Sequence, residues 1–121
     1  MNPADLFRHE PDAVALVPGE FLFRQGDTGN HMFVLLEGAA DVVVGTQVVE
    51  TAGPGALLGE MALIDRSPRT ASVKARENCR LAKIDVQRFH FLIRQNPFFA
   101  VHVMKVLSDR LRRMDQRLAG S

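Results

Sequence analysis

Glycines divide the first two thirds of the chain into short apolar runs. Between Val14 and Ala82, turn-forming glycines interrupt the apolar runs at close intervals. The interrupting residues are Gly19, Gly26, Gly29, Gly38, Gly45, Gly53 and Gly55. Many short strands joined by frequent turns are typical of a β-sandwich or a β-barrel. The pattern therefore predicts a β-rich fold for this part of the chain.

The apolar runs between the glycines are the candidate strands. They are residues 15–16, 21–24, 31–37, 39–44, 47–51, 71–74 and 79–84. Turn residues bound each run, as expected for strands of an antiparallel sheet. Together these runs place the β region at about residues 14–84.

After the last predicted strand, helix-capping residues replace the turn-forming glycines. Asp85 is a good N-cap for a helix that ends near Gln95, because a short carboxylate accepts from the free N–H groups of a first turn. Pro97 suits the first turn of another helix, and neither glycine nor proline interrupts the chain from there to Leu118. The sequence predicts two C-terminal helices over about residues 85–118, and a short helix before the β region.

The last predicted helix carries apolar residues at alternating steps of four and three. They are Ala100, Met104, Leu107, Leu111, Met114 and Leu118. Such a seam fits a single helix that lies on its own β-barrel, and it also fits two helices that pair in a coiled coil. A basic flank keeps the other faces hydrated, so we favour a homodimer formed through this helix. The residues of this flank are Lys105, Arg110, Arg112, Arg113 and Arg117.

Length and composition set the class of the molecule. The 121 residues suffice for one domain, since isolated domains most often have roughly 100–150 residues. A hydrophobic fraction of 46% and a charged fraction of 24% are typical of a water-soluble globular protein. The net charge of +1 does not require a nucleic-acid or membrane partner. We expect residues 1–121 to form a single domain.

Cysteine usage and the lack of long apolar runs bear on localisation. The single Cys79 cannot form a disulfide within the chain. No apolar run approaches the roughly 20 residues that span a bilayer, and the first ten residues lack the order of a secretion signal. These observations predict a cytoplasmic protein without a membrane segment.

The segment 59–71 combines residues that bind anions. Gly59 permits a close backbone approach, and residues 60–64 favour a short helical turn whose free N–H groups point at an anion. Arg69 follows a Ser-Pro turn, and its planar guanidinium can bind a phosphate through paired hydrogen bonds. Glu60 would repel a bare phosphate, so we interpret it as an acceptor for a sugar hydroxyl beside the phosphate. The combination predicts a site for a nucleotide with a free 2′-hydroxyl.

Residues 59–63 and 68–71, with the sequences GEMAL and PRTA, resemble the phosphate-binding cassette of cyclic-nucleotide-binding domains. These domains occur in bacterial catabolite activators, cyclic-nucleotide-gated channels and regulatory subunits of cAMP-dependent kinase. Upstream, the resemblance includes Gly19, Glu20, Gln25, Gly26, Asp27, Gly29, Phe33, Glu37 and Gly38, and downstream it includes Asn96 and Pro97. It covers residues 14–118, nearly the whole chain.

The resemblance implies a role for each residue of the cassette. Glu60 would bind the ribose 2′-hydroxyl, and Arg69 would bind the cyclic phosphate. Thr70 would add a hydroxyl to the phosphate or to a guanine base. The implied ligand-binding set is Gly59, Glu60, Met61, Ala62, Arg69, Thr70 and Ala71, and the candidates for a lid over the base are Arg113, Met114 and Asp115. The family usually has an aromatic residue where this chain has Leu58, which weakens the motif but leaves its polar contacts whole.

Three other chemistries find little support. A metal enzyme of the cupin kind needs clustered histidines, but only His31 falls in the β region, and no His-x-His pair occurs. No serine lies in a Gly-x-Ser-x-Gly elbow. The basic last helix also contains acidic residues and is not followed by a recognition helix. We therefore expect no catalysis, no metal, no cofactor and no nucleic-acid contact.

The resulting prediction is an α+β protein: an eight-stranded antiparallel jelly-roll-like β-roll, a short N-terminal helix and two C-terminal helices. It is expected to bind a 3′,5′-cyclic purine nucleotide, with cAMP favoured over cGMP, and to signal through movement of its last helix. The alternatives are a ligand-free protein-interaction domain of the same fold, and the regulatory domain of a transcription factor or channel.

Overall fold

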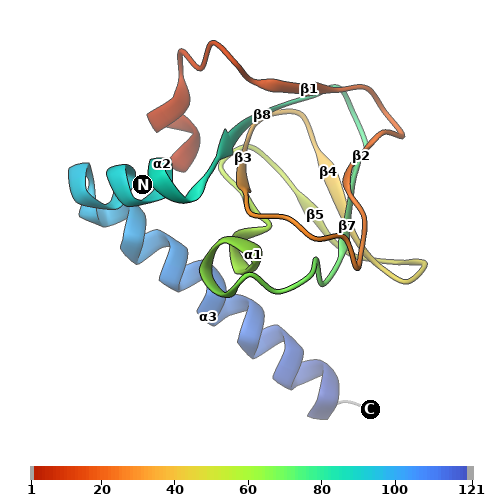
Figure 1. The fold of residues 1–121 in the computed structure, drawn as a ribbon. Helices are drawn as coiled ribbons and strands as arrows, with labels where there is room; N and C mark the ends of the chain where they lie inside the picture. Colours follow the sequence, from red (N-terminus) through yellow and green to blue (C-terminus); the bar gives the residue numbers. More distant parts are fainter. Residues whose placement is uncertain (1, 120–121) are drawn as a thin grey trace.

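The computed structural model describes residues 2–119 and contains two four-stranded antiparallel sheets (Figure 1). One sheet has the order β1-β8-β3-β6, and the other has the order β2-β7-β4-β5. The strands are β1 (Val14–Leu16), β2 (Phe21–Phe23), β3 (Met32–Glu37), β4 (Ala40–Val44), β5 (Gln47–Ala52), β6 (Leu57–Leu58), β7 (Ser72–Ala75) and β8 (Cys79–Ile84). The predicted eight-stranded β-roll is confirmed.

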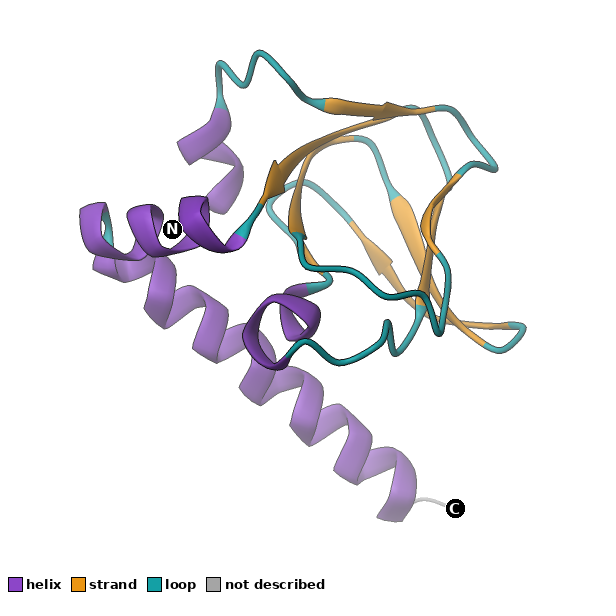
Figure 2. Ribbon diagram, in the orientation of Figure 1, coloured by secondary structure: helices purple, strands orange, loops and turns teal. Residues whose placement is uncertain are grey.

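The helices gather on one side of the β-roll (Figure 2). They are the 3-10 helix η1 (Pro3–Phe7) and the α-helices α1 (Glu60–Asp65), α2 (Val86–Gln95) and α3 (Pro97–Ala119). Asp85 caps α2 as predicted, because its carboxylate accepts from the backbone N–H of Arg88 at 2.7 Å. The predicted α+β class, with a short N-terminal helix and two C-terminal helices, is therefore confirmed. No helix in the described part of the chain is long and apolar enough to cross a membrane.

The short strand β6 was missing from the predicted strands. It pairs with β3 through Phe33 opposite Leu58 and Val34 opposite Leu57. Two residues are too few to show an alternation of apolar and polar side chains, so this strand has no signature of its own. The other predicted strands are found with ends that shift by one residue, apart from β8, whose predicted bounds match.

Strand β3 is buried on both faces. Met32 and Val34 join a core between the first sheet and the helices, with Phe7, Leu57, Leu63, Ala82, Ile84, Phe99 and Val103. Phe33 and Leu35 face the second sheet and join Ala40, Ala52, Leu58, Val73, Ala75, Cys79 and Leu81. Successive side chains of a strand point to opposite faces, so an unbroken apolar run fits a strand between two cores. Packed cores on both sides of β3 therefore support the part of the fold that contains the ligand pocket described below.

Helix α3 packs on the core through a face that overlaps the predicted seam at Leu107. Phe99 and Val103 are buried, and Leu107 is half-buried against the same cluster. Met104 and Leu111 of the seam are 59% and 60% exposed. Leu107 of the seam therefore makes the contact that a single helix lying on its own β-roll requires, whereas Met104 and Leu111 of the seam do not. The side chains of Met114 and Leu118 lie outside the described residues.

Candidate ligand-binding site

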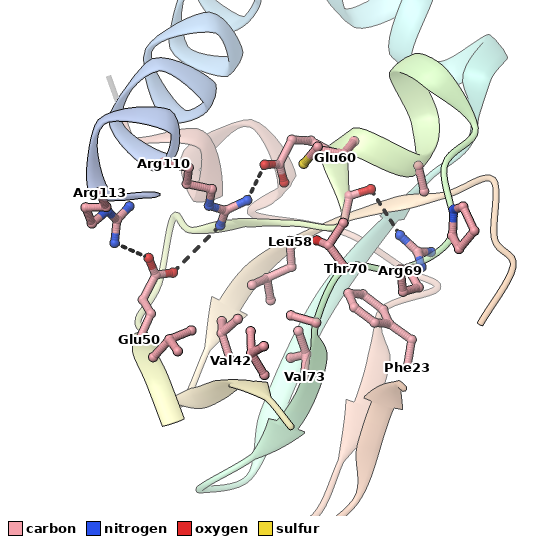
Figure 3. A pocket seen from close by; sticks show the side chains of 17 residues that line it. Phe23, Val42, Glu50, Leu58, Glu60, Arg69, Thr70, Val73, Arg110 and Arg113 are labelled. Carbon is pink, nitrogen blue, oxygen red and sulfur yellow. Dashed lines mark hydrogen bonds and ion pairs between the residues drawn. The ribbon is translucent and has the colours of Figure 1, made fainter. Parts of the chain in front are cut away.

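A pocket of about 380 Å³ opens between strands β4, β5 and β7, helix α1 and helix α3. Its volume lies in the range of small-molecule sites, roughly 300–1,000 Å³. All seven residues of the predicted ligand-binding set line it: Gly59, Glu60, Met61, Ala62, Arg69, Thr70 and Ala71. Figure 3 shows how the polar side chains lie around this pocket. The cavity is therefore lined both by residues that are close together in the sequence and by residues from distant elements.

The backbone of Arg69 is held by the loop between β2 and β3. The N–H of Arg69 donates to the carbonyl of Asp27 at 2.8 Å, and the N–H of Gly26 donates to the carbonyl of Arg69 at 2.8 Å. These two bonds give the segment after α1 a fixed path. The direction of the arginine side chain is therefore set by a segment more than 40 residues earlier.

The guanidinium of Arg69 is buried and lacks a carboxylate partner within hydrogen-bonding distance in the described part of the chain. It donates to the carbonyls of Gly59 at 3.0 Å and His31 at 2.9 Å, and it stacks on the ring of Phe23 at 4.1 Å. Its Nε is buried and has no described partner. Burial lowers the pKa of this guanidinium, while Asp27 and Glu60 act in the opposite direction. A buried cation held by neutral carbonyls is suited to an incoming anion.

Two glycines make room for this guanidinium. A Cβ at Gly29 would lie 2.6 Å from Nη2 of Arg69, and a Cβ at Gly59 would collide with Nη1. Gly59 also has a φ of 75°, in the left-handed region that favours glycine, and it occupies the N-cap position of α1. A side chain at either position would displace the arginine. The glycine next to Glu60 therefore serves both the turn and the placement of Arg69.

Glu60 is 1% exposed and faces helix α3. One carboxylate oxygen, Oε1, accepts from Arg110 Nη1, and the other oxygen, Oε2, is buried without a described partner. A buried carboxylate oxygen without a hydrogen bond is costly. Oε2 is thus an open acceptor, and it complements the open donor on Arg69.

The remaining wall of the pocket is apolar. Phe23, Val42, Val44, Val49, Leu58 and Val73 line it. Figure 3 shows Val42 and Val73 below the polar groups, with Arg69 at one end of the cavity and Glu50 at the other. A flat apolar group attached to a polar, anionic group would match both parts of the cavity.

Sequence reasoning missed two polar residues of this pocket. Glu50 comes from β5 and Arg110 comes from α3, and both line the cavity. Arg110 Nη2 donates to the carbonyl of Leu57 at 2.7 Å and lies 3.7 Å from Oε2 of Glu50. Arg110 was read as part of a hydrated basic flank, because a charge on a helix gives no sign of which distant carboxylate it meets. This reading was wrong for Arg110.

The three candidates for a lid differ in position. Arg113 lines the pocket and donates to the carboxylate of Glu50. Asp115 is exposed and is not among the residues that line the cavity. The side chain of Met114 lies outside the described residues. The arginines that α3 brings to the pocket are Arg110 and Arg113, one helical turn apart.

No group of three or more His, Cys, Asp or Glu side chains in residues 2–119 is placed to hold a metal ion. Cys79 is buried and unbridged, and its Sγ donates to the carbonyls of Ala39 at 3.2 Å and Glu77 at 3.3 Å. Burial raises the pKa of this thiol, which keeps it in the unreactive protonated form. The charged groups that line the pocket belong to arginines and glutamates.

A double-sheet β-roll, a cavity under a short helix and a long helix across its mouth define a small-molecule-binding domain. The sequence model described as cyclic nucleotide-binding domain matches residues 13–96. The chain belongs to the cyclic nucleotide-binding domain family.

Similar proteins include a channel. Potassium/sodium hyperpolarization-activated cyclic nucleotide-gated channel 1 of Homo sapiens is 30% identical over 100 residues, which make up 83% of this chain and 11% of the channel. This chain therefore corresponds to a small part of that relative.

Solved structures share the fold. The catabolite activator protein of Thermus thermophilus is 31% identical with a TM-score of 0.78, over 88% of this chain and 53% of that one. A structure described as cAMP-bound PfPKA-R is 27% identical with a TM-score of 0.70, over 80% of this chain and 34% of that one.

Proposed function

We propose that this chain is a sensor domain that binds a 3′,5′-cyclic purine nucleotide in the pocket beneath α1. One observation carries the proposal: the buried Nε of Arg69 and the buried Oε2 of Glu60 both lack described partners and both belong to the same cavity. The first is a charged donor and the second is an acceptor. A ligand that presents an anionic oxygen and a hydroxyl side by side satisfies both.

The cyclic phosphate of such a nucleotide lies on Arg69, and its ribose 2′-hydroxyl donates to Oε2 of Glu60. Gly59, Met61 and Ala62 contribute backbone groups of α1, and Thr70 and Ala71 border the phosphate. The purine lies on the apolar wall, where Val42 and Val73 provide a flat surface. The lid is formed by Arg110 and Arg113 of α3.

We favour cAMP over cGMP as the ligand. The support is a similar structure described as bound to cAMP, and the similarity to a catabolite activator protein. Thr70 lines the pocket and its hydroxyl suits either nucleotide.

The output of the domain is the position of α3. A ligand changes an equilibrium between two positions of a helix only to the extent that it binds one position more tightly. Arg110 and Arg113 connect α3 to the pocket, so occupancy of the pocket reaches the helix through them. No catalytic step is part of this proposal, and the molecule works as a single regulatory domain, 1–121, in the cytoplasm.

A homodimer through α3 extends the proposal. Met104 and Leu111 leave an apolar stripe exposed at coiled-coil spacing. A second copy of the same helix is complementary to such a stripe, because two identical seams interdigitate. Nucleic acid and membrane are not contacted by this chain in the proposal.

The alternative is the regulatory domain of a transcription factor or a channel. The gated channel and the catabolite activator protein are longer than this chain, which spans 11% and 53% of them. A ligand-free protein-interaction domain of the same fold is a further alternative, and it leaves the buried Arg69 and Glu60 without a purpose.

Isothermal titration of the purified protein with cAMP, cGMP and 5′-AMP tests the proposal. Binding of one cyclic nucleotide at micromolar concentration or below, with little response to 5′-AMP, is the expected result. The open-phosphate control carries an additional charge and lacks the ring that fixes the phosphate beside the ribose. Absence of binding to all three nucleotides would instead favour the protein-interaction domain.

A further inference from the structure

Glu50 of strand β5 faces two arginines of helix α3 at the end of the pocket away from Arg69 (Figure 3). Its carboxylate accepts from Arg113 Nη1 and lies 3.7 Å from Arg110 Nη2. The same Arg110 donates through Nη1 to Oε1 of Glu60. Arg110 is thus shared by two carboxylates from different elements.

The second half of α3 has few other ties to the β-roll among the described side chains. Phe99 and Val103 pack into the core near the start of the helix, whereas Leu111 is exposed. Beyond Leu107, the described hydrogen bonds and ion pairs between α3 and other elements are those of Arg110 and Arg113. The position of this half of the helix therefore depends on polar contacts with Glu50, Glu60 and Leu57.

This group contains two positive charges, on Arg110 and Arg113, and two negative charges, on Glu50 and Glu60. Without the carboxylate of Glu50, Arg113 loses its described partner, and Arg110 keeps the carboxylate of Glu60 and the carbonyl of Leu57. Partly buried charges require partners, because removal of one member of such a pair leaves the other poorly solvated. Glu50 therefore favours the position of α3 in which Arg110 reaches the pocket.

We propose that Glu50 is a positioning residue that couples helix α3 to ligand binding, a role that rests on the proposed function. Glu50 holds Arg110 so that it occupies Oε1 of Glu60 and leaves Oε2 open toward the cavity. A ligand hydroxyl then donates to Oε2 of a carboxylate whose orientation is already set. Because coupling is reciprocal, the ligand stabilises the docked position of α3 by the same factor by which docking of α3 strengthens ligand binding.

The test is Glu50→Gln in the full chain, which keeps the size of the side chain and removes its charge. Titration with cAMP and with 2′-deoxy-cAMP is the readout. We expect the variant to bind cAMP about threefold to tenfold more weakly, the scale of a partly buried ion pair. The loss is smaller for 2′-deoxy-cAMP, because that ligand makes no bond to Glu60. Glu50→Asp keeps the charge and restores part of the affinity for cAMP.

Glu37→Gln is the matched control. Glu37 pairs with Arg80 at 2.9 Å on the exposed surface, and it does not line the pocket. This variant removes the same charge and leaves both affinities unchanged. Equal weakening of both ligands by Glu50→Gln, or no weakening of either, would show that Glu50 does not act through Glu60.

A distance measurement between two spin labels reports the position of helix α3 directly. Spin labels at Thr46 and Gln116, both exposed, are placed in a Cys79→Ser background. We expect Glu50→Gln to broaden the distance distribution of the ligand-free protein, and added cAMP to narrow it. A distribution identical to that of the parent overturns the positioning role. A parent protein that binds no cyclic nucleotide overturns the proposed function, whereas a parent that binds normally beside an unchanged Glu50→Gln variant overturns the role of Glu50 alone.

Discussion

Arg110 of helix α3 donates to Oε1 of Glu60, the first residue of helix α1, from 50 residues further along the chain. Glu60 is almost fully buried, and its second oxygen, Oε2, stays without a described partner. The pair therefore joins the C-terminal helix to the pocket and leaves one acceptor open.

Arg69→Ala removes the buried cation of the pocket. We expect a loss of about 2–5 kcal/mol of binding free energy, because a phosphate would lose its charged hydrogen-bond partner in a water-poor site. Titration with cAMP measures the loss. Arg66→Ala is the control, since Arg66 is exposed and does not line this pocket. Arg69 also ties Gly59 to His31, so thermal unfolding must show that the variant is folded. Unchanged affinity in a folded variant would exclude Arg69 from the site.

Glu60→Ala removes the acceptor for the ribose hydroxyl. We expect binding to weaken by about 1–3 kcal/mol, the range for a hydrogen bond to a charged group. The variant should also lose the preference for cAMP over 2′-deoxy-cAMP, because the hydroxyl no longer has a partner. Titration of cAMP and of 2′-deoxy-cAMP into the parent protein and into the variant measures both effects. A preference that survives in the variant would assign the hydroxyl to another residue.

Gly59→Ala should separate backbone strain from displacement of Arg69. The new Cβ would collide with Nη1 of Arg69, so we expect cAMP affinity to fall by more than about tenfold, or 1.4 kcal/mol. Gly45→Ala is the matched control, because Gly45 also has a positive φ, 63°, but its Cβ would meet nothing within 4 Å. Both variants should lose about 1 kcal/mol of stability, the typical cost of a strained backbone. Equal affinities of the two variants would contradict the placement of Arg69 by Gly59.

Met104→Asp combined with Leu111→Asp tests pairing through α3. Both side chains are exposed, so the substitutions leave the core of the domain intact. A charge in the seam of a coiled coil is strongly unfavourable, and we expect the mass measured by sedimentation to fall from dimer to monomer. Val48→Asp, at another exposed apolar residue, leaves the mass unchanged. A parent protein that already sediments as a monomer would show that the stripe does not pair.

Stability should decline at acid pH through two histidines. Burial lowers the pKa of His31, with Lys83 and Arg69 acting in the same direction and Asp85 opposing them. Burial also lowers the pKa of His102. Below pH 6.5 the unfolded chain therefore binds more protons than the folded chain. The contribution to stability is present above the ordinary pKa of 6.5 and is lost as pH falls from that value through the lowered pKa of the folded state. Urea midpoints at several pH values should depend less on pH in the variant His31→Gln, His102→Gln. An equal dependence in parent and variant would refute this assignment.

Local signals in the sequence predicted most of the fold. Asp85 shows the start of α2, since a cap acts on the first turn that follows it. The glycines mark turns because a positive φ is a property of single residues, as at Gly38 and Gly45. Strand β6 escaped prediction because two residues carry no period. Its existence depends on the pairing with β3, a distant segment.

The sequence by itself determined the glycine turn and the short helix that open the segment 59–71, because these are set by neighbouring residues. The path of Arg69 depends instead on the loop between β2 and β3. Only the tertiary structure decided which side chains from distant elements contact this segment. Arg110 reaches Glu60, and Glu50 accepts from Arg113 of the same helix. Leu107 of the seam packs on the core, whereas Met104 and Leu111 are exposed. The physical reason is that an ion pair forms wherever the packing of sheets and helices brings two charges together, and a charged residue looks the same in the sequence whether its neighbour in space is water or a buried carboxylate.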